Sequence, residues 1–348
     1  MGRHPVRLPR EDRGLLEIVS HARTPPLRRD RLSPDQIAQV ARTVRRTPEV
    51  MVKVTGGGTS IRAVSAHLAY ITRHSDLDLH SDDGTVASDR DTQRALTKHW
   101  HLDLSSRQGG SRGGSDKPGR AYKLVQNIVL SMPHPTPPEK VLAAARVFAR
   151  EKFGLQHRYA MALHTDQRHP HVHLVVKAEG YDGRRLHIDK PMLRMWREDF
   201  ARMMRAQGVA ANATPRALRG RNKGHTRTEV LRARQRNAST SERSRIRDIG
   251  KELQRTGRVA DPAHARLVET RKVLLAQWEQ VAQTLDAQGE TVLAGDVRYY
   301  AKTLPPVLTD RERAASVFIA FIKEERAKEQ RVKRPERVRD RGEEALTR

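Results

Sequence analysis

The 348-residue chain carries 67 Lys and Arg against 41 Asp and Glu, and its formal net charge of +26 predicts a polyanionic partner, with nucleic acid ahead of an acidic membrane surface. Cysteine is absent, which excludes disulfides and thiolate metal ligands, and aromatic residues at 4% are too few for single-strand binding mainly by base stacking. No run approaches the roughly 20 apolar residues of a membrane span, and the N-terminus lacks the apolar core of a signal peptide, so we expect a cytoplasmic protein.

Changes in the sequence pattern along the chain predict more than one domain. Residues 1–48 are basic and in part Pro-rich, with one helix expected from the capping pattern Ser33–Gln36, so this segment is expected to be an arm. We expect four parts: a basic N-terminal arm at 1–48, a mixed domain at 49–215, a basic helical region at 216–324, and a charged tail at 325–348 that is disordered or a fraying helix.

Strands and helices alternate from residue 49 to residue 208. The alternating segment Val50–Thr55 predicts a strand that ends in Gly56–Gly58, and a helix is expected from about residue 60 to 73. Residues 105–120 are rich in Gly and Ser and predict a mobile loop. Further strands are expected at 122–133, 158–163 and 171–177, and further helices after a capping box at Thr136–Glu139 and after Asp189. This order predicts an α+β domain whose central strands pair as a hairpin.

Beyond Gly208 the strand pattern ends and helical periodicity dominates. Residues 216–236 hold eight Lys or Arg against the single acid Glu229. This tract predicts phosphate contacts with little base readout, or simply a solvated helix face. A last helix is expected to begin at the capping pattern Thr309–Glu312 and to carry Phe318 and Ile322.

Four of the sixteen histidines and one carboxylate lie close together between His164 and His173. Because residues two apart on a strand share a face, His171 and His173 project together, and a tight turn would bring His164 beside them. Three neutral imidazoles form a plausible set of metal ligands with open positions for water or substrate oxygens. A tighter turn would let His169 replace His164. The opposite face of the strand carries Val172, Leu174 and Val176.

Tyr70 is the best-placed nucleophile among the six tyrosines. In the helix that follows Gly58, the apolar side chains fall within one narrow arc, and Tyr70 lies roughly 140° from its centre. An anionic ligand that approaches Tyr70 would meet the positive potential of His67, Arg73 and His74. The alternative interpretation is an ordinary half-buried tyrosine.

Three segments together resemble the motifs of conjugative relaxases, which belong to the HUH endonuclease class. They are Ala66–Arg73, Ser131–Pro133, and the pair His164-x-Asp166 and His171-x-His173. The most similar branch is the MOB-P branch, which includes the T-DNA border endonuclease, and the resemblance covers Val50 to Gly220. It implies an HUH-type central antiparallel sheet flanked by helices, and a site- and strand-specific DNA nickase acting at an origin of transfer.

The resemblance also implies roles for individual residues. Tyr70 would attack the scissile phosphate and become joined to its 5′ side, while Asp166 would orient an imidazole or help to take the tyrosine proton. The metal ligands would be His164, His171 and His173, holding Mg²⁺ or Mn²⁺. The expected DNA contacts are Ser131, Arg73, His169, Arg216, Arg219, Arg221 and Lys223.

Two other functions fit parts of the pattern. A metal-dependent hydrolase would use the same histidines to activate water, and a non-catalytic nucleic-acid-binding protein would depend on the basic tract alone. By the resemblance, the expected partners are DNA that is single-stranded at the nick, accessory transfer proteins and a type IV secretion coupling protein. The protein would then act in the bacterial cytoplasm and pass with DNA to a recipient cell.

Overall fold

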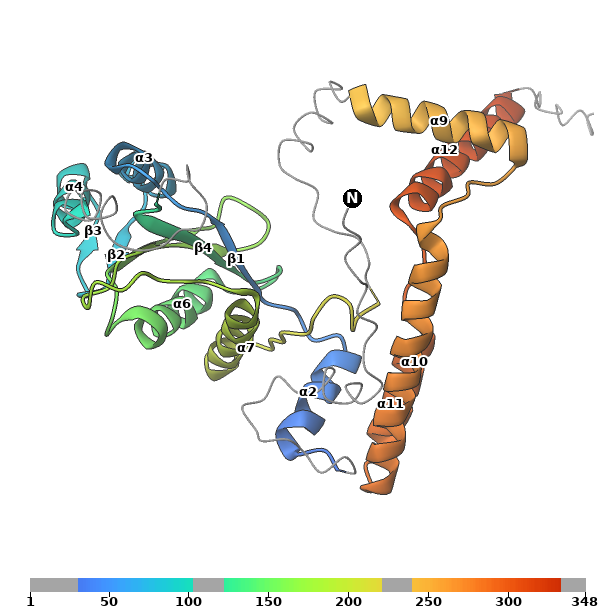
Figure 1. The fold of residues 1–348 in the computed structure, drawn as a ribbon, viewed down its shortest axis with the longest axis horizontal. Helices are drawn as coiled ribbons and strands as arrows, with labels where there is room; N and C mark the ends of the chain where they lie inside the picture. The colour runs from blue at the N-terminus through green and yellow to red at the C-terminus, as the bar shows by residue number, and fades with distance from the viewer. Residues whose placement is uncertain (1–30, 103–121, 221–239, 333–348) are drawn as a thin grey trace, which may run out of the picture. The chain divides into compact units, whose positions relative to one another are not determined.

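The computed structural model describes residues 31–102, 122–220 and 240–332 of the chain (Figure 1). It divides into two compact units. The first consists of Met1–Pro215 together with Gln277–Lys302, and the second of Arg216–Ala276 together with Thr303–Arg348. The histidine cluster and Tyr70 both belong to the first unit.

A six-stranded sheet forms the centre of the first unit. Its strands are β1 Met51–Gly56, β2 Leu79–Ser81, β3 Val86–Ala87, β4 Val125–Ser131, β5 Tyr159–His164 and β6 His171–Lys177, in the spatial order β1-β4-β6-β5-β2-β3. Every strand pair is antiparallel, and β5 and β6 form the expected hairpin. The α+β class is therefore confirmed. The sequence pattern did not indicate β2 and β3, because strands this short give no readable alternation.

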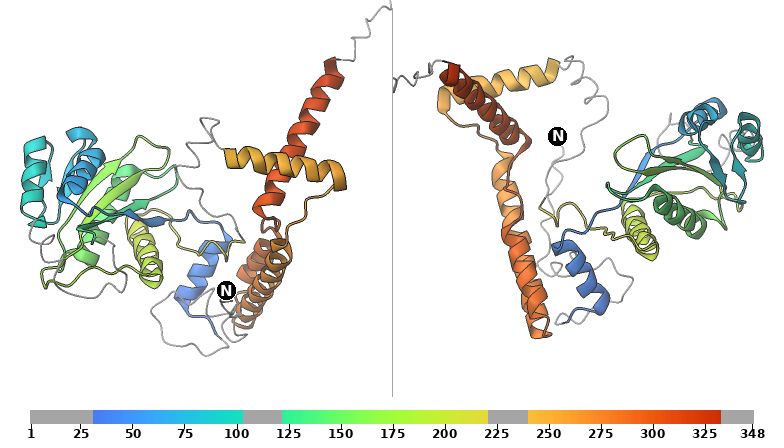
Figure 2. Two further views of the ribbon diagram at one scale, coloured as in Figure 1. Left: turned by 45° about the horizontal axis from the view of Figure 1, so that its top comes forward. Right: turned by 180° about the vertical axis from the view of Figure 1, so that it is seen from behind.

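Helices cover both faces of this sheet (Figures 1 and 2). They are α3 Ile61–Ile71 and α4 Arg90–Lys98 on one face, and α6 Pro138–Phe153 and α7 Lys190–Ala206 on the other. The larger core lies under α6 and α7, where Phe148, Trp196 and Phe200 pack edge to face. Under α3, Val64 and Leu68 pack against Val125, Val175 and other buried residues. Tyr159 of β5 is also buried in the larger core.

Local capping explains where the helices begin. Ser33 and Gln36 form the expected capping box of α2 Pro34–Val44, and the Asp189 side chain accepts from the Met192 N–H at the start of α7. The capping box expected at Thr136 is wrong. Its hydroxyl donates backwards to the Pro133 carbonyl, and Pro137 is the residue before α6. Since Pro137 and Pro138 have no N–H, a cap at Thr136 would have lost one of its two backbone donors.

Helix α2 is joined to the segment after α7 by buried polar side chains. The Asn212 side chain donates to the hydroxyls of Thr43 and Thr214, at 3.2 and 2.7 Å, and the Gln39 side chain donates to the Asn212 side-chain oxygen. A buried network in which each partner is satisfied fixes local geometry strongly. This network holds α2, which precedes β1, against the segment that follows α7.

All regular structure described after residue 216 is helical, as expected. The helices are α9 Thr240–Thr256, α10 Ala263–Ala287, α11 Thr291–Lys302 and α12 Asp310–Val332. Thr309 caps α12 in a reciprocal pair with Glu312, as the sequence predicted. In the second unit, Arg311 of α12 pairs with Glu252 of α9. None of the helices in the described part of the chain is both long and apolar enough to cross a membrane.

Candidate active site

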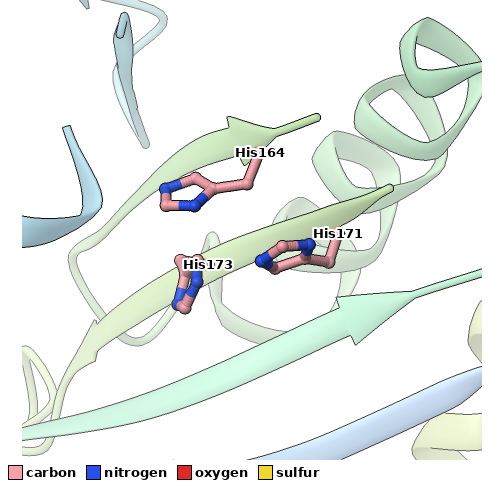
Figure 3. A group of neighbouring side chains, drawn as sticks. All are labelled: His164, His171 and His173. Atoms are coloured by element: carbon pink, nitrogen blue, oxygen red, sulfur yellow. The ribbon is translucent and has the colours of Figure 1, made fainter. Parts of the chain in front are cut away.

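Three histidines from two neighbouring strands converge at one end of the sheet. His164 of β5 lies directly across from His171 of β6, and His173 follows on the same face of β6. One ring nitrogen from each residue lies within 4.8 Å of the others, and the ring centroids are 4.5 to 5.1 Å apart. Figure 3 shows the three rings turned toward a common point. The cluster therefore fits a single metal ion.

Backbone carbonyls fix the tautomers of two of these rings. Nε2 of His164 donates to the Ile71 carbonyl at 2.6 Å, which leaves Nδ1 as the lone-pair nitrogen. Nδ1 of His171 donates to the His169 carbonyl at 3.0 Å, which leaves Nε2. Such contacts to the second ring nitrogen orient metal-binding histidines and raise their basicity as ligands. Both rings are therefore held in a form that can bind a metal.

Burial favours the neutral form of two of the three histidines. Desolvation, followed by the charges of the neighbouring imidazoles, lowers the pKa of His173 to about 3. Desolvation also lowers the pKa of His164, which is 1% exposed. Metal ligation requires the neutral imidazole. These two ligands are thus ready to bind at neutral pH without losing a proton.

Tyr70 stands beside the histidines on the last turn of α3. Its side chain is 53% exposed, and its ring centroid lies 6.4 Å from that of His173, edge to face. His67, one turn earlier, stacks on Tyr70 at 6.2 Å and meets His173 at 6.3 Å. The spacing of three residues on the helix was the only sequence signal for the contact between His67 and Tyr70. The hydroxyl-bearing ring and the candidate metal ligands therefore form one site.

Arg73 connects the tyrosine to the histidine cluster. Its guanidinium lies over the Tyr70 ring at 5.5 Å, forms an ion pair with Asp166, and donates to Nδ1 of His164 at 3.4 Å. That contact uses the lone pair that a metal would need, so cation binding and the Arg73 contact are alternatives. Asp166 also lies 3.7 Å from the same nitrogen.

The backbone at Arg73 is strained. Arg73, His74 and Ser75 have φ values of 51°, 60° and 85°, in the left-handed region that side chains other than glycine rarely adopt. Three such residues in succession cost free energy that the surrounding contacts must offset. This turn ends α3 and directs the Arg73 side chain back over Tyr70.

Two other expected contact residues lie at the edge of this cluster. Ser131 is opposite His171 on β4, but it is buried, and its hydroxyl donates to the Pro170 carbonyl at 3.1 Å. Nδ1 of His169 accepts from the His134 N–H at 3.1 Å, and His169 does not belong to the three-histidine group. The exposed His169 is open to a ligand, whereas the Ser131 hydroxyl is already engaged.

The expected basic contacts do not belong to the described part of the first unit. Arg216 and Arg219 belong to the second unit, not to the unit that carries the histidines. Arg221 and Lys223 lie outside the described residues. The structure therefore joins Tyr70, Arg73, Asp166 and the three histidines.

Comparison with known proteins agrees with this geometry. Residues 87–209 match the family model described as relaxase, MobA/VirD2-like, nuclease domain, a range that contains the three histidines but not Tyr70. The T-DNA border endonuclease VirD2 of Rhizobium radiobacter is 28% identical over 189 residues, which cover 49% of this chain and 43% of that protein. The VirD2 proteins of Rhizobium rhizogenes and Agrobacterium fabrum are 26% and 27% identical over the same length.

The chain thus spans less than half the length of these curated relatives. The matched region contains the hairpin of β5 and β6, which carries the three histidines, and the helices α6 and α7, which cover one face of the sheet. Residues 87–209 of the chain are therefore similar to a relaxase nuclease domain, and the antiparallel sheet with helices on both faces fits an HUH-type fold. Over about half of its length the chain resembles the T-DNA border endonuclease VirD2.

Proposed function

We propose that this protein is a DNA relaxase that nicks one strand at an origin of transfer and becomes joined to the 5′ phosphate through Tyr70. The observation that carries the proposal is the exposed Tyr70 ring 6.4 Å from His173, at a cluster of three histidines that comes from a distant part of the sequence. A hydrolase that activates water has no need of a tyrosine at this place.

The reaction is a transesterification. The phenolic oxygen of Tyr70 attacks the scissile phosphorus, the bond between Tyr70 oxygen and phosphorus forms, and the bond from phosphorus to the 3′ oxygen breaks. The phenol gives up one proton and the 3′ oxygen takes up one, so no net proton is consumed. One phosphodiester replaces another, so the step is reversible, and the free 3′-OH can later reseal the strand. This reversibility suits a protein that transfers DNA.

A phenol with a pKa near 10 is a weak nucleophile at neutral pH, so the site must assist it. His164, His171 and His173 would hold a divalent cation, which neutralises charge on the phosphate in the transition state. Mg²⁺ and Mn²⁺ are the proposed ions. Imidazole nitrogen is a softer donor than the oxygen ligands that Mg²⁺ prefers, so Mn²⁺ should bind more tightly.

Asp166 and Arg73 would complete the site. Asp166 lies next to His164 and is half exposed, so it can orient that ring or accept the Tyr70 proton. Arg73 offers a planar guanidinium over the tyrosine ring, where it can meet a phosphate oxygen. His169 and the basic residues Arg216, Arg219, Arg221 and Lys223 are proposed to bind DNA backbone, with a strong dependence on salt.

The wider role is proposed in the same terms. The arm at 1–48, the nuclease domain at 49–215, the basic helical region at 216–324 and the tail at 325–348 would divide the work of binding, nicking and transfer. Accessory transfer proteins and a type IV secretion coupling protein are the proposed partners. The protein would nick in the bacterial cytoplasm and travel with the strand.

The test is a covalent adduct that survives denaturation. Supercoiled plasmid carrying the cognate origin is incubated with Mn²⁺ and either wild-type protein, Tyr70→Phe or Tyr299→Phe. Tyr299 is the matched control, because its ring is exposed on α11. Wild type and Tyr299→Phe should give the adduct, and Tyr70→Phe should give neither nick nor adduct.

Other outcomes identify the alternatives. Nicking by Tyr70→Phe without an adduct would establish a hydrolase. Equal DNA binding by wild type and by a variant with all three histidines replaced, with no nicking by either, would establish a non-catalytic binding protein.

A further inference from the structure

The edge strand β1 has two unlike faces. Val50, just before the strand, and Val52 are buried in the core under α6 and α7. The alternate residues Met51, Lys53 and Thr55 are exposed. We call these three residues the edge strip. One side of β1 thus stabilises the domain, and the other is left uncovered by the described residues.

The strand register places the edge strip beside the active site. Met51 is paired with Ser131, which is paired with His171. Lys53 is paired with Val129, which is paired with His173. Directly paired residues point to the same side of a sheet, so the strip shares the face of the histidines. Two strand spacings separate Lys53 from His173, which is roughly 10 Å.

Helix α3 covers only the other part of that face. The core beneath it includes residues of β4, β5 and β6, and none of its described members comes from β1. The strip therefore runs along the free edge of the sheet, on the face of the histidine cluster and separated from it by β4. Its far end also carries positive charge, because the Lys123 ammonium lies 3.5 Å from the Gly56 carbonyl.

We propose that the edge strip binds the single-stranded DNA next to the scissile phosphate, so that the strand leaves the active site over β1. This inference rests on the proposed function and adds a binding surface to it. Lys53 has no ion-pair partner among the described residues, and it would meet a phosphate. Met51 is a flexible, polarisable side chain that can lie against a base.

Charge and continuity favour DNA over a second protein chain. The net charge of +26 opposes close pairing of two copies, while it attracts a polyanion. A lysine in the middle of an edge strand also discourages strand-to-strand association. The edge strip has an apolar side chain at Met51 and a cationic one at Lys53. It lies on the same face of the sheet as the residues proposed to hold the scissile phosphate.

The chain contains no cysteine, so single cysteines can report on this surface. Met51→Cys places a thiol in the strip, and Met195→Cys places one on α7, which covers the opposite face. The two methionines are 44% and 50% exposed, which makes them a matched pair. The rate of maleimide labelling of each full-length variant is measured with and without a mixed-sequence single strand of about 20 nucleotides at low salt.

Saturating single-stranded DNA should slow the labelling of Met51→Cys at least fivefold and that of Met195→Cys less than twofold. In a second measurement, Lys53→Gln should weaken single-strand binding about threefold and reduce its salt dependence by about one phosphate contact. Lys190→Gln, at an exposed position at the start of α7, should leave both unchanged.

Equal labelling of Met51→Cys with and without saturating DNA would overturn the inference. Protection that grows with protein concentration in the absence of DNA would also overturn it, because the strip would then join two copies of the chain. Adduct formation at Tyr70 is scored separately. If the Tyr70 adduct forms but DNA does not protect Met51→Cys from labelling, this inference alone is wrong. If DNA protects Met51→Cys but no adduct forms, the proposed function is wrong and the edge strip remains a binding surface.

Discussion

The two faces of strand β6 differ in what they do, although their residues alternate along one segment. Val172, Leu174 and Val176 are fully buried under α6 and α7, while His171 and His173 face the opposite way, beside His164 and Tyr70. The two-residue period of a strand places a stabilising side chain next to each candidate ligand. Neighbouring substitutions should therefore have opposite kinds of effect, one on folding and one on chemistry.

The largest effect on folding is expected on the core face. Leu174→Ala removes a buried side chain from a packed core and should lower the free energy of unfolding by about 2–5 kcal/mol. Urea denaturation followed by circular dichroism measures this change. A loss below about 1 kcal/mol would mean that the two faces of β6 do not differ as described.

The adjacent substitution should act on chemistry instead. His173→Ala should weaken Mn²⁺ binding and slow nicking by at least about 100-fold, because even partners behind metal ligands contribute 10- to 100-fold. Its free energy of unfolding should change by less than about 1 kcal/mol. Calorimetry with Mn²⁺ and denaturation of the metal-free protein provide the two readouts. Unaltered Mn²⁺ affinity would remove His173 from the proposed ligand set.

Replacing Arg73 tests how a neighbouring positive charge affects metal binding by the histidines. Arg73→Gln removes a cation that contacts Nδ1 of His164, so Mn²⁺ should bind the variant roughly threefold more tightly or better. Nicking should slow, because the guanidinium beside Tyr70 is lost. Arg62→Gln, at an exposed position on the same helix, serves as the control. Weaker Mn²⁺ binding by Arg73→Gln would contradict the view that Arg73 and the ion compete.

A dependence on pH is expected from an acid on α7, which covers the core face. Burial, followed by the charge of Asp199, raises the pKa of Glu198 from 4.5 to about 8. The folded state therefore holds this proton more tightly than the unfolded state does. The resulting stability is fully present below pH 4.5 and is lost as the pH rises through about 8. Glu198→Gln should flatten the decline in unfolding free energy across this window, and parallel profiles for the two proteins would refute the assignment.

Much of this arrangement could be predicted from local pattern. The alternation in β6, the spacing of His171 and His173, and the caps at Ser33 and Asp189 depend on neighbours in the sequence, and the structure contains all of them. The position of Tyr70 off the apolar arc of α3 follows from helical periodicity in the same way.

Contacts between distant segments could not be predicted. The ion pair of Arg73 with Asp166 depends on a left-handed turn, and this turn contains no glycine from which it could have been predicted. The Ser131 hydroxyl is engaged by the Pro170 carbonyl, which becomes a neighbour only when β4 pairs with β6. The edge strip likewise appears only from the strand order, because β1 is far in sequence from β4, with which it pairs, and from the hairpin of β5 and β6 beyond β4.

The most direct test of the central claim is the location of the covalent bond. Wild-type protein is incubated with origin plasmid and Mn²⁺, the DNA is trimmed with nuclease, and the protein is digested and mapped by mass spectrometry. We expect a nucleotide on the peptide that contains Tyr70, and we expect this modification to be lost when His171 is replaced by Ala. A nucleotide on Tyr181 or Tyr299, or nicked plasmid without any modified peptide, would rule out Tyr70 as the nucleophile.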